Sequence, residues 1–356
     1  MKGVVLSGGY GTRLRPLTHT GPKQLIPIAN KPMLFYAIED LRDAGVRDIA
    51  IILGTICPEK VKEAIGDGSK LGVKITYIHQ GEPKGIAHAV ACARKFVKNE
   101  PFVVYLGDNV LKGGIGDFAK EFLKGKYDAG ILLSKIKNPE RFGVAEIKDG
   151  KVVKLVEKPK VPKSDLALVG IYLFRSSIFK AIAQLKPSWR SEYEITEAID
   201  YLIENKYEVM HHTVKGWWKD TGKPEDIIEA NHLLLDDLVA AHNGVIEEGA
   251  TVRGKVSIGK GTVVSGRSFI KGPVIIGEHC EIGPNVYIGP YTSIGNDCFL
   301  KDVEIESSIV MDGSKIECNK RIVDSLIGRE SLIISGVNEL PKAIRLVLGE
   351  NSYISV

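Results

Sequence analysis

Residues 3–16 read GVVLSGGYGTRLRP, and this stretch decides the fold of the N-terminal half. The apolar run at its start predicts a buried parallel strand, and three glycines follow within four positions. Open α/β sheets bind ligands at the carboxyl ends of such strands. Glycines let backbone N–H groups approach phosphate oxygens, and Arg13 and Lys23 supply the positive charge that a triphosphate requires. We therefore predict a nucleotide-phosphate site at this edge.

Two better-known glycine loops do not fit this stretch. A dinucleotide-binding fingerprint needs a third glycine where this chain has Leu14, and a Walker A loop needs Gly-Lys-Ser/Thr, which is absent. The glycines alone are also typical of a tight surface turn. Arg13 and Lys23 favour the phosphate site over that alternative.

Strand-like and helix-like segments alternate through the first two thirds of the chain. The expected strands are 49–53, 74–79, 102–106, 130–134 and 207–214. The expected helices are 33–44, 58–65, 86–96 and 192–205. This alternation predicts an α/β fold, with a Rossmann-like, mostly parallel sheet covered by helices on both faces.

The last third of the chain follows a six-residue period. Ten aliphatic side chains share one phase: Ile246, Val252, Ile258, Val264, Ile270, Ile276, Ile282, Ile288, Ile294 and Leu300. A coil made of three hexads stacks these side chains in interior columns. The pattern resembles the left-handed parallel β-helix of hexapeptide-repeat proteins.

The period is interrupted once before the chain ends. Glu306 breaks the phase and Val310 resumes it, which we interpret as an insertion that forms a bulging loop. Residues 337–348 are expected to form a short capping segment.

A chain of 356 residues exceeds one ordinary domain. We predict two domains, residues 1–239 and 240–356, joined by a helix over 224–238.

Composition excludes several classes of protein. The formal net charge is only +4, from 48 basic and 44 acidic residues, which disfavours binding to nucleic acid or to a membrane surface. Five widely spaced cysteines without a Cys-x-x-Cys pair argue against zinc and against a disulfide framework. The N-terminus enters a strand without a signal-like leader, and no apolar run approaches the ~20 residues of a membrane helix. A cytoplasmic location is expected.

Five short segments together resemble a known family. They are residues 8–14, 22–23, 106–109, 157–159 and 218–222, which read GGYGTRL, PK, LGDN, EKP and WKDTG. Their order and spacing resemble the motifs of sugar-1-phosphate nucleotidyltransferases. The set is most similar to glucose-1-phosphate thymidylyltransferases of the long type, which carry an appended β-helix. Each motif is weak alone, but the resemblance covers essentially the whole chain.

The resemblance implies a reaction between two anions. An oxygen of glucose-1-phosphate attacks the α-phosphorus of dTTP, and pyrophosphate leaves. No general base is required, because the second pKa of a phosphate monoester is about 6 and the nucleophile arrives mostly ionised. The protein must instead supply cations and hold the reacting oxygens in line.

The resemblance also assigns the catalytic residues. Arg13 and Lys23 match the cations that stabilise the triphosphate. Asp108 and Asp220 match the carboxylates that hold Mg²⁺, for which one or two carboxylates plus substrate phosphates suffice. Taken singly, Asp108 is equally typical of a turn, and Asp220 of a turn or a helix cap.

Substrate-binding residues follow from the same motif matches. The expected nucleotide-binding residues, besides Arg13 and Lys23, are Leu6, Gly8, Gly9, Gly11, Thr12, Gln80 and Gly85. The expected sugar-phosphate-binding residues are Gly143, Glu157, Lys158, Tyr172 and Arg190. A glutamine amide offers donor and acceptor together, which suits the imide edge of thymine or uracil. One methyl group separates these bases, so the residues leave dTTP and UTP open.

Two other functions remain open from the sequence. Hexapeptide β-helices often belong to acyltransferases, so a bifunctional enzyme that also acetylates an amino-sugar phosphate is one alternative. Its base would be His279, for which a solvated or stacking role in a turn is favoured. A non-catalytic regulatory or assembly subunit is the other, and the full set of charged motif residues disfavours it. A homo-oligomer is expected, with a trimer the first hypothesis.

Overall fold

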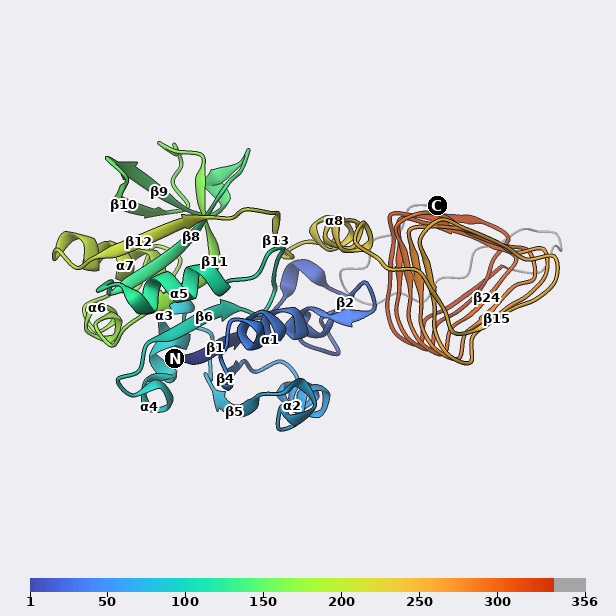
Figure 1. Ribbon diagram of the computed structural model, residues 1–356, viewed down its shortest axis with the longest axis horizontal. Helices are drawn as coiled ribbons and strands as arrows, with labels where there is room; N and C mark the ends of the chain where they lie inside the picture. The colour runs from blue at the N-terminus through green and yellow to red at the C-terminus, as the bar shows by residue number, and fades with distance from the viewer. Residues whose placement is uncertain (336–356) are drawn as a thin grey trace. The chain divides into compact units, whose positions relative to one another are not determined.

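The computed structural model describes residues 1–335, which fall into two compact units (Figure 1). The first unit consists of Met1–Gly11, Thr20–Leu25 and Met33–Asp220. The second consists of Thr12–His19, Ile26–Pro32 and the chain from Thr221 onward. The predicted boundary at residues 239 and 240 remains a proposal.

A nine-stranded mixed sheet forms the centre of the first unit. Its main path runs β10-β9-β11-β6-β1-β4-β5, and β8 lies between β11 and β12. The strands are β1 (Lys2–Ser7), β4 (Asp48–Leu53), β5 (Lys74–His79), β6 (Phe102–Leu106), β8 (Ala129–Lys135), β9 (Gly143–Lys148), β10 (Lys151–Glu157), β11 (Leu166–Phe174) and β12 (Val209–Thr213). The predicted α/β class is confirmed.

The sheet is parallel among the strands that come early in the chain and mostly antiparallel among the later ones. Strands β1, β4, β5 and β6 pair in parallel, as do β8 and β12. Strand β11 runs antiparallel to β6 and β8, and β9 runs antiparallel to β10. The sheet is therefore less parallel than expected in its second half, where the β9–β10 hairpin replaces a helical crossover.

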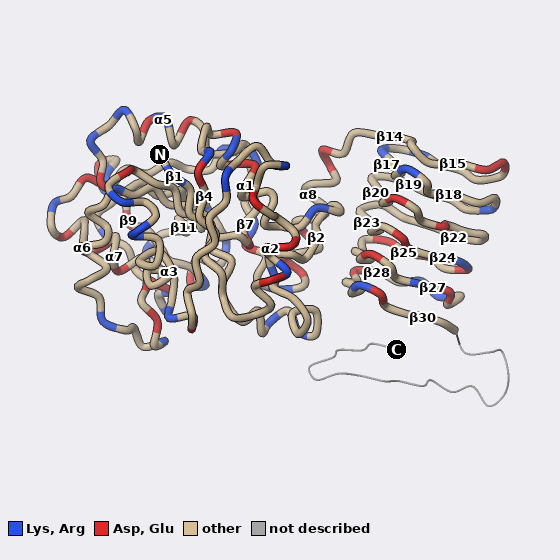
Figure 2. The backbone as a smooth tube through the Cα atoms, turned by 90° about the horizontal axis from the view of Figure 1, so that it is seen from below, with Lys and Arg blue, Asp and Glu red and all other residues tan. Residues whose placement is uncertain are grey.

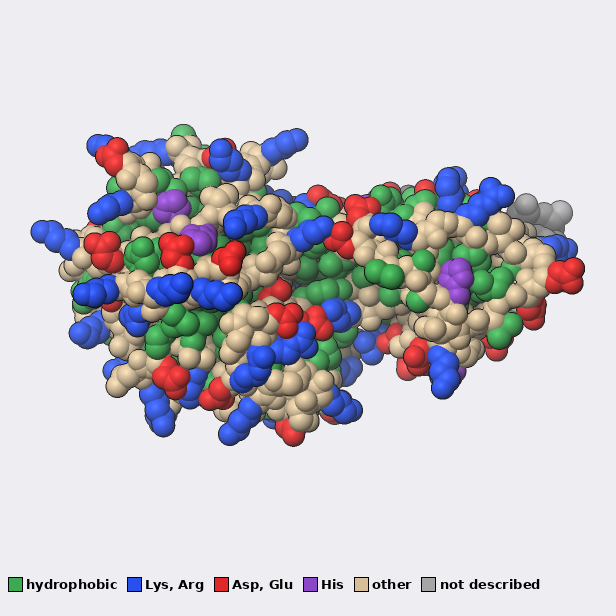
Figure 3. Space-filling model, viewed as in Figure 1, with side chains coloured by type: hydrophobic (Ala, Val, Ile, Leu, Met, Phe, Trp, Pro, Cys, Tyr) green, Lys and Arg blue, Asp and Glu red, His purple; other side chains and the backbone are tan. Residues whose placement is uncertain are grey.

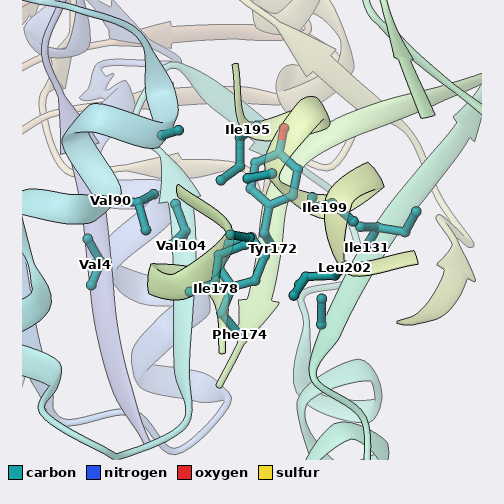
Figure 4. Close-up of a cluster of buried hydrophobic side chains, with 14 of the residues drawn as sticks. Val4, Val90, Val104, Ile131, Tyr172, Phe174, Ile178, Ile195, Ile199 and Leu202 are labelled. Atoms are coloured by element: carbon teal, nitrogen blue, oxygen red, sulfur yellow. The ribbon is translucent and has the colours of Figure 1, made fainter. Parts of the chain in front are cut away.

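Helices cover both faces of the sheet. One face carries α1 (Met33–Asp43), α2 (Pro58–Ile65) and α5 (Gly116–Lys124), and the other carries α3 (Ile86–Cys92), α4 (Arg94–Val97), α6 (Ile178–Ile182) and α7 (Ile195–Glu204). Neighbouring strand residues point to opposite faces, so Val4 and Val104 pack in one core (Figure 4) while Val5 and Tyr105 pack in the other. The helix predicted over residues 86–96 is divided at Ala93.

Short elements complete the first unit. Strands β7 (Asn109–Leu111) and β13 (Trp218–Asp220) form a separate antiparallel ladder. Three further 3₁₀ turns are Lys23–Leu25, Ser69–Leu71 and Pro139–Arg141.

The second unit is built on a three-sided parallel β-helix, whose coils stack in Figure 2. Its strands are β14 (Ala241–His242), β15 (Val245–Ile246), β16 (Thr251–Arg253), β17 (Val256–Ile258), β18 (Val263–Val264), β19 (Phe269–Lys271), β20 (Val274–Ile276), β21 (Glu281–Ile282), β22 (Val286–Ile288), β23 (Thr292–Ile294), β24 (Phe299–Lys301), β25 (Val303–Glu306), β26 (Ile309–Val310), β27 (Lys315–Glu317), β28 (Arg321–Val323), β29 (Leu326–Ile327) and β30 (Leu332–Ile334).

The hexad prediction is confirmed by the register of these strands. Val252 pairs with Ile270 and Ile258 with Ile276, so one coil takes 18 residues. The hexad side chains from Ile258 onward are buried in one core, consistent with a left-handed β-helix. Helix α8 (Pro224–Leu235), the short strands β2 (Pro27–Ile28) and β3 (Lys31–Pro32), and the 3₁₀ turn Thr12–Leu14 also belong to this unit.

The predicted bulging loop at Glu306 is wrong. Glu306 ends strand β25, and Ile305 takes the interior position by pairing with Ile288. Leu300, Ile305 and Val310 are five residues apart, so two corners of the coil are each one residue shorter. The phase shifts because turns shorten, while the interior columns continue unbroken.

Three smaller expectations can be compared with the structure. The capping segment 337–348 lies outside the described residues. The five cysteines form no disulfide with one another. Within residues 1–335, no helix combines the length and apolar character needed to cross a bilayer. Figure 3 shows basic and acidic side chains interspersed over the face that it presents, in keeping with the small net charge.

Candidate active site

The glycine loop begins where β1 ends and is closely packed. A Cβ on Gly54 would lie 2.9 Å from the Cα of Gly8, so the two backbones approach as only glycines permit. Gly9 adopts φ 93° and Gly11 φ 60°. The buried Gln24 donates from Nε2 to the Gly8 carbonyl at 3.1 Å. The loop is therefore fixed on a rigid edge of the sheet, beside the buried Leu6.

The predicted phosphate motif is divided between the two units. Leu6 and the three loop glycines belong to the first unit, together with Lys23. Thr12 and Arg13 lie in the 3₁₀ turn of the second unit, and both are exposed.

Lys23 and Asp108 form an ion pair in the first unit. Lys23 Nζ contacts Asp108 Oδ2, and both side chains are largely buried. Burial opposes ionisation of Asp108, but the Lys23 ammonium and hydrogen bonds from Lys23, its own backbone and Asn109 outweigh it and hold the pKa of Asp108 below its usual range. Asp108 is therefore kept as a carboxylate, the form that binds a cation.

The buried Asn109 connects three parts of this site. Its Nδ2 donates to Asp108 Oδ1 at 3.2 Å. Its Oδ1 accepts from Trp218 Nε1 at 2.6 Å and from the Gly170 backbone N–H at 3.3 Å. One side chain thus ties the Asp108 turn to β13 and to β11.

Asp220 is brought to the same place by the short ladder. It pairs with Asn109 across β7 and β13. Cross-strand partners lie on one face of a ladder, with Cα atoms about 4.5–5.5 Å apart. The ladder thereby places Asp220 opposite the residue that follows Asp108, although the two segments are more than 100 residues apart in sequence. Carboxylates are the donor type that suits a small divalent cation. Within residues 1–335, no group of three or more His, Cys, Asp and Glu side chains is arranged to hold a metal ion.

The residues expected to contact the base lie beside the glycine loop. Gln80 follows β5, and a Cβ on Gly8 would lie 2.9 Å from Gln80 Oε1. Gln80 Nε2 donates to the Gly85 carbonyl at 3.3 Å and contacts His88 Nδ1 at 3.2 Å. Gly85 has φ 99°, and a Cβ there would meet the Tyr193 backbone at 2.5 Å. The backbone at Gly85 therefore requires glycine.

The residues expected to bind the sugar phosphate form a charged cluster. Arg190 Nη1 lies 3.5 Å from Glu157 Oε1 and 3.3 Å from Glu194 Oε1. Lys158 Nζ lies 3.8 Å from Glu157 Oε1, and Thr196 donates to Glu157 Oε2 at 3.0 Å. Burial first, and then Glu194, raise the pKa of Glu157; Lys158, Thr196 and Arg190 oppose the shift in part.

Gly143 and Tyr172 complete this side of the site. A Cβ on Gly143 would lie 2.5 Å from Thr196 Cγ2 and 3.3 Å from Glu157 Oε2. Tyr172 is buried, and its hydroxyl lies at the edge of the core, away from Phe174 (Figure 4). Burial, followed by the negative charges of Glu157, Asp220 and Glu194, raises the pKa of Tyr172 far above its usual value. The sugar-side cluster and Asp220 are therefore near the same hydroxyl.

Several supporting residues were not predicted. Gln24, Thr196, Glu194 and His88 each contact an expected site residue, and Asn109 was quoted in a motif without a role. The only sequence signal for these residues is their nearness to motifs. Thr196 contacts Glu157 across 39 positions, and the other supporting residues contact partners 1 to 16 positions away.

Comparisons with known proteins agree with this arrangement. The Nucleotidyl transferase family model matches residues 2–237, and the GMPPB C-terminal domain model matches residues 265–354. The chain is 50% identical to the low-salt glycan biosynthesis nucleotidyltransferase Agl11 of Haloferax volcanii, over all of both chains. It is 46% identical to a glucose-1-phosphate thymidylyltransferase of Streptomyces antibioticus, over all of this chain and 99% of that protein.

A solved structure shows the same fold over about two thirds of the chain. It is of a Bacillus anthracis protein assigned as a glucose-1-phosphate thymidylyltransferase, in complex with a sucrose. It is 38% identical, with a TM-score of 0.63, and the match covers 68% of this chain and 98% of that one. The chain therefore belongs to the sugar-1-phosphate nucleotidyltransferases, enzymes of a family that generally depends on a divalent metal.

Proposed function

We propose that this nucleotidyltransferase transfers the thymidylyl group of dTTP to glucose-1-phosphate, with Mg²⁺ as the metal, giving dTDP-glucose and pyrophosphate. The observation that carries the proposal is the joining of Asp108 and Asp220 through Asn109, beside Lys23 and a glycine loop. The full-length similarity to the Streptomyces antibioticus enzyme supports the choice of both substrates.

Electrostatics carries most of the catalysis in this proposal. The sugar phosphate is already ionised at neutral pH, so the obstacle is repulsion between two anions. Asp108 and Asp220 would hold Mg²⁺, which neutralises phosphate charge when bound. Lys23 and Arg13 add fixed positive charge for the triphosphate, and Lys23 also keeps Asp108 ionised.

The charged cluster on the other side would bind the sugar phosphate. Lys158 and Arg190 supply cations for the phosphate, and the Glu157 carboxylate accepts hydrogen bonds from sugar hydroxyls. Thr196 holds one Glu157 oxygen at 3.0 Å, which leaves the other oxygen to face its cations. Tyr172, which is buried at the edge of the core, would lie beneath the sugar.

A pyrophosphate-release screen tests the substrates. dTTP, UTP, ATP, GTP and CTP are each combined with glucose-, galactose- and N-acetylglucosamine-1-phosphate. We expect the highest kcat/KM for dTTP with glucose-1-phosphate, and a preference over UTP of about 10–200-fold at most, because one methyl group separates the bases. A preference for a purine triphosphate would refute the proposal.

A bifunctional enzyme with acetyltransferase activity is the second candidate. The chain is 40% identical to a protein of Methanocaldococcus jannaschii named bifunctional protein GlmU, over 92% of this chain and 78% of that protein. His279 would have to be the base. It is exposed in a turn, and a Cβ on Gly261 would lie 2.4 Å from its Nδ1, so the ring lies over the neighbouring coil.

An acetyl-CoA assay with glucosamine-1-phosphate separates the two candidates. A cavity of about 460 Å³ opens on the β-helix, lined by Arg267, Phe269, Asn285, Val286, Tyr287, Glu304 and Arg321. His279 does not line this cavity. We expect no acetyl transfer, and turnover abolished by His279→Ala would establish the second activity. The oligomeric state and the cytoplasmic location remain predictions.

A further inference from the structure

The Gln80 side chain is held in one orientation. A Gln80 amide has one group that donates and one that accepts, and rotating it by half a turn exchanges them. Its Nε2 faces the Gly85 carbonyl at 3.3 Å. A carbonyl oxygen only accepts, so the NH₂ group must lie on this side and Oε1 must lie toward Gly8.

The second N–H of the same amide is directed at His88. Gln80 Nε2 and His88 Nδ1 are 3.2 Å apart. Since the amide nitrogen donates, Nδ1 must be the unprotonated nitrogen of the ring. Burial, and then the nearby Lys84, lower the pKa of His88, which favours this neutral form.

The backbone around these contacts is fixed. His88 lies on α3 between the buried Ala87 and Ala89. The Ala87 N–H donates to the Tyr193 carbonyl at 3.1 Å, and the Tyr193 N–H donates to the Lys84 carbonyl at 2.8 Å. The histidine ring is therefore presented from a helix that is itself tied to the segment before α7.

We propose that His88 is a positioning residue that keeps the Gln80 carbonyl turned toward the base site, so that the enzyme selects pyrimidines whose ring nitrogen carries a proton. The inference rests on the proposed function in one respect, namely that Gln80 contacts the base. Thymine and uracil present N–H to an acceptor at this edge. Cytosine presents a ring nitrogen that is itself an acceptor, so two acceptors would face each other.

The contacts also explain why both partners are needed. Gly85 alone satisfies one N–H, and the longer bond at 3.3 Å leaves the amide free to rotate at a small cost. With His88 as well, rotation would break two hydrogen bonds, because Oε1 would then face the Gly85 carbonyl oxygen and a ring nitrogen that carries no proton in this tautomer. Only a change of tautomer at His88 would restore the second bond. His88 thereby fixes the Gln80 amide so that its Oε1 faces the base and accepts a hydrogen bond from a ring N–H.

Selectivity between pyrimidines tests this role. kcat/KM is measured for dTTP, UTP and dCTP with the wild-type enzyme and with His88→Phe, His88→Ala and His88→Asn. Phenylalanine keeps the ring without an acceptor, alanine keeps the helix, and asparagine restores an oxygen near the position of Nδ1. His212→Phe is the matched control, because this half-buried histidine contacts Glu121 and Phe118 instead.

We expect His88→Phe and His88→Ala to reduce the dTTP-to-dCTP ratio of kcat/KM by about two- to tenfold, chiefly through KM, because one neutral hydrogen bond to the Gln80 amide is lost. His88→Asn should recover most of the dTTP-to-dCTP ratio. In every variant, kcat/KM for UTP should change in parallel with kcat/KM for dTTP. A ratio unchanged in both acceptor-free variants, or an equal fall for every nucleotide, would overturn the proposal. Failure of the proposed function is a separate outcome, seen as a wild-type enzyme that does not prefer dTTP or UTP.

Discussion

Asp220 pairs with Asn109 across the ladder of β7 and β13, and Asn109 in turn donates to the Asp108 carboxylate at 3.2 Å. Asp108 and Asp220, which are 112 positions apart, are therefore both linked to Asn109, the first through its buried side-chain amide and the second through the strand ladder. The segment between them builds β8 to β12, so the pairing of β7 with β13 links the two ends of that part of the sheet. The arrangement ties the metal-binding hypothesis to the folding of the whole first unit.

Replacing the amide tests its connecting role. Asn109→Leu leaves the Trp218 indole N–H and the Gly170 N–H without their acceptor in a buried setting. We expect the free energy of unfolding to fall by about 2–4 kcal/mol, because each buried unsatisfied donor costs about 1–3 kcal/mol. Denaturant unfolding measures this change, and Asn205→Ala at the exposed end of α7 is the control. Equal stability of Asn109→Leu and wild type would contradict the role of the Asn109 amide as the acceptor for Trp218 and Gly170.

The Lys23 ammonium sets the protonation of Asp108. A carboxyl with a lowered folded pKa contributes stability above its unfolded pKa, about 3.9, and loses it as the pH falls through the folded value. In Lys23→Gln the burial of Asp108 remains while its cation is gone, so its pKa should rise. The acid limb of kcat/KM against pH should then move to higher pH.

Lys62→Gln is the control for this experiment, because Lys62 pairs with Glu59 on the exposed surface of α2. Its profile should match wild type. An acid limb of Lys23→Gln at the wild-type position would show that Lys23 does not control Asp108.

The pKa of Glu157 is shifted in the opposite direction to that of Asp108. Its raised folded pKa means that the folded protein binds more protons than the unfolded chain, so the Glu157 contribution to stability falls as the pH rises from about 4.3 through the folded value. Glu157→Gln removes this dependence. The difference in unfolding free energy between variant and wild type should therefore shift in favour of the variant with rising pH, while KM for the sugar phosphate increases. A pH-independent difference would contradict the raised pKa.

The second unit depends on a buried amide of its own. Asn231 Oδ1 accepts from the Ala29 N–H at 2.8 Å and from Ser293 Oγ at 2.7 Å, and Nδ2 donates to the Tyr291 carbonyl at 3.0 Å. Asn231→Leu should lower the stability of this unit by about 2–4 kcal/mol. Thermal unfolding measures the loss. The exposed Asn243→Leu should change stability by no more than about 0.5 kcal/mol, and equal effects of both would contradict the account.

Repeating local patterns made most of the fold predictable. Hexad side chains such as Ile270 and Ile288 are spaced by the coil itself, so their burial follows from sequence. The parallel strands β4 and β5 were recognisable from their apolar and β-branched residues. Strand β10 was not predicted, because its buried and exposed residues do not alternate strictly and its register shifts between Val152 and Lys154.

The supporting residues of the site could not be predicted in the same way. Asn109 and Trp218 are hydrogen bonded across 109 positions, and Thr196 and Glu157 across 39. Such contacts depend on which strands become neighbours, which no local pattern encodes. His88 illustrates the limit, since a histidine on a helix carries no sign that its ring reaches the Gln80 amide.

The most direct test of the central claim is the affinity for Mn²⁺ in the presence of dTTP, measured from the electron paramagnetic resonance signal of the unbound ion. Wild type, Asp108→Asn, Asp220→Asn and the double variant are compared, with the exposed Asp117→Asn as control. Each single variant should bind Mn²⁺ about tenfold more weakly or worse, since even residues that only support metal ligands contribute 10–100-fold. Because the two carboxylates share one ion, the effects should be non-additive in the double variant. Wild-type affinity in either single variant would contradict the claim that Asp108 and Asp220 hold the same ion.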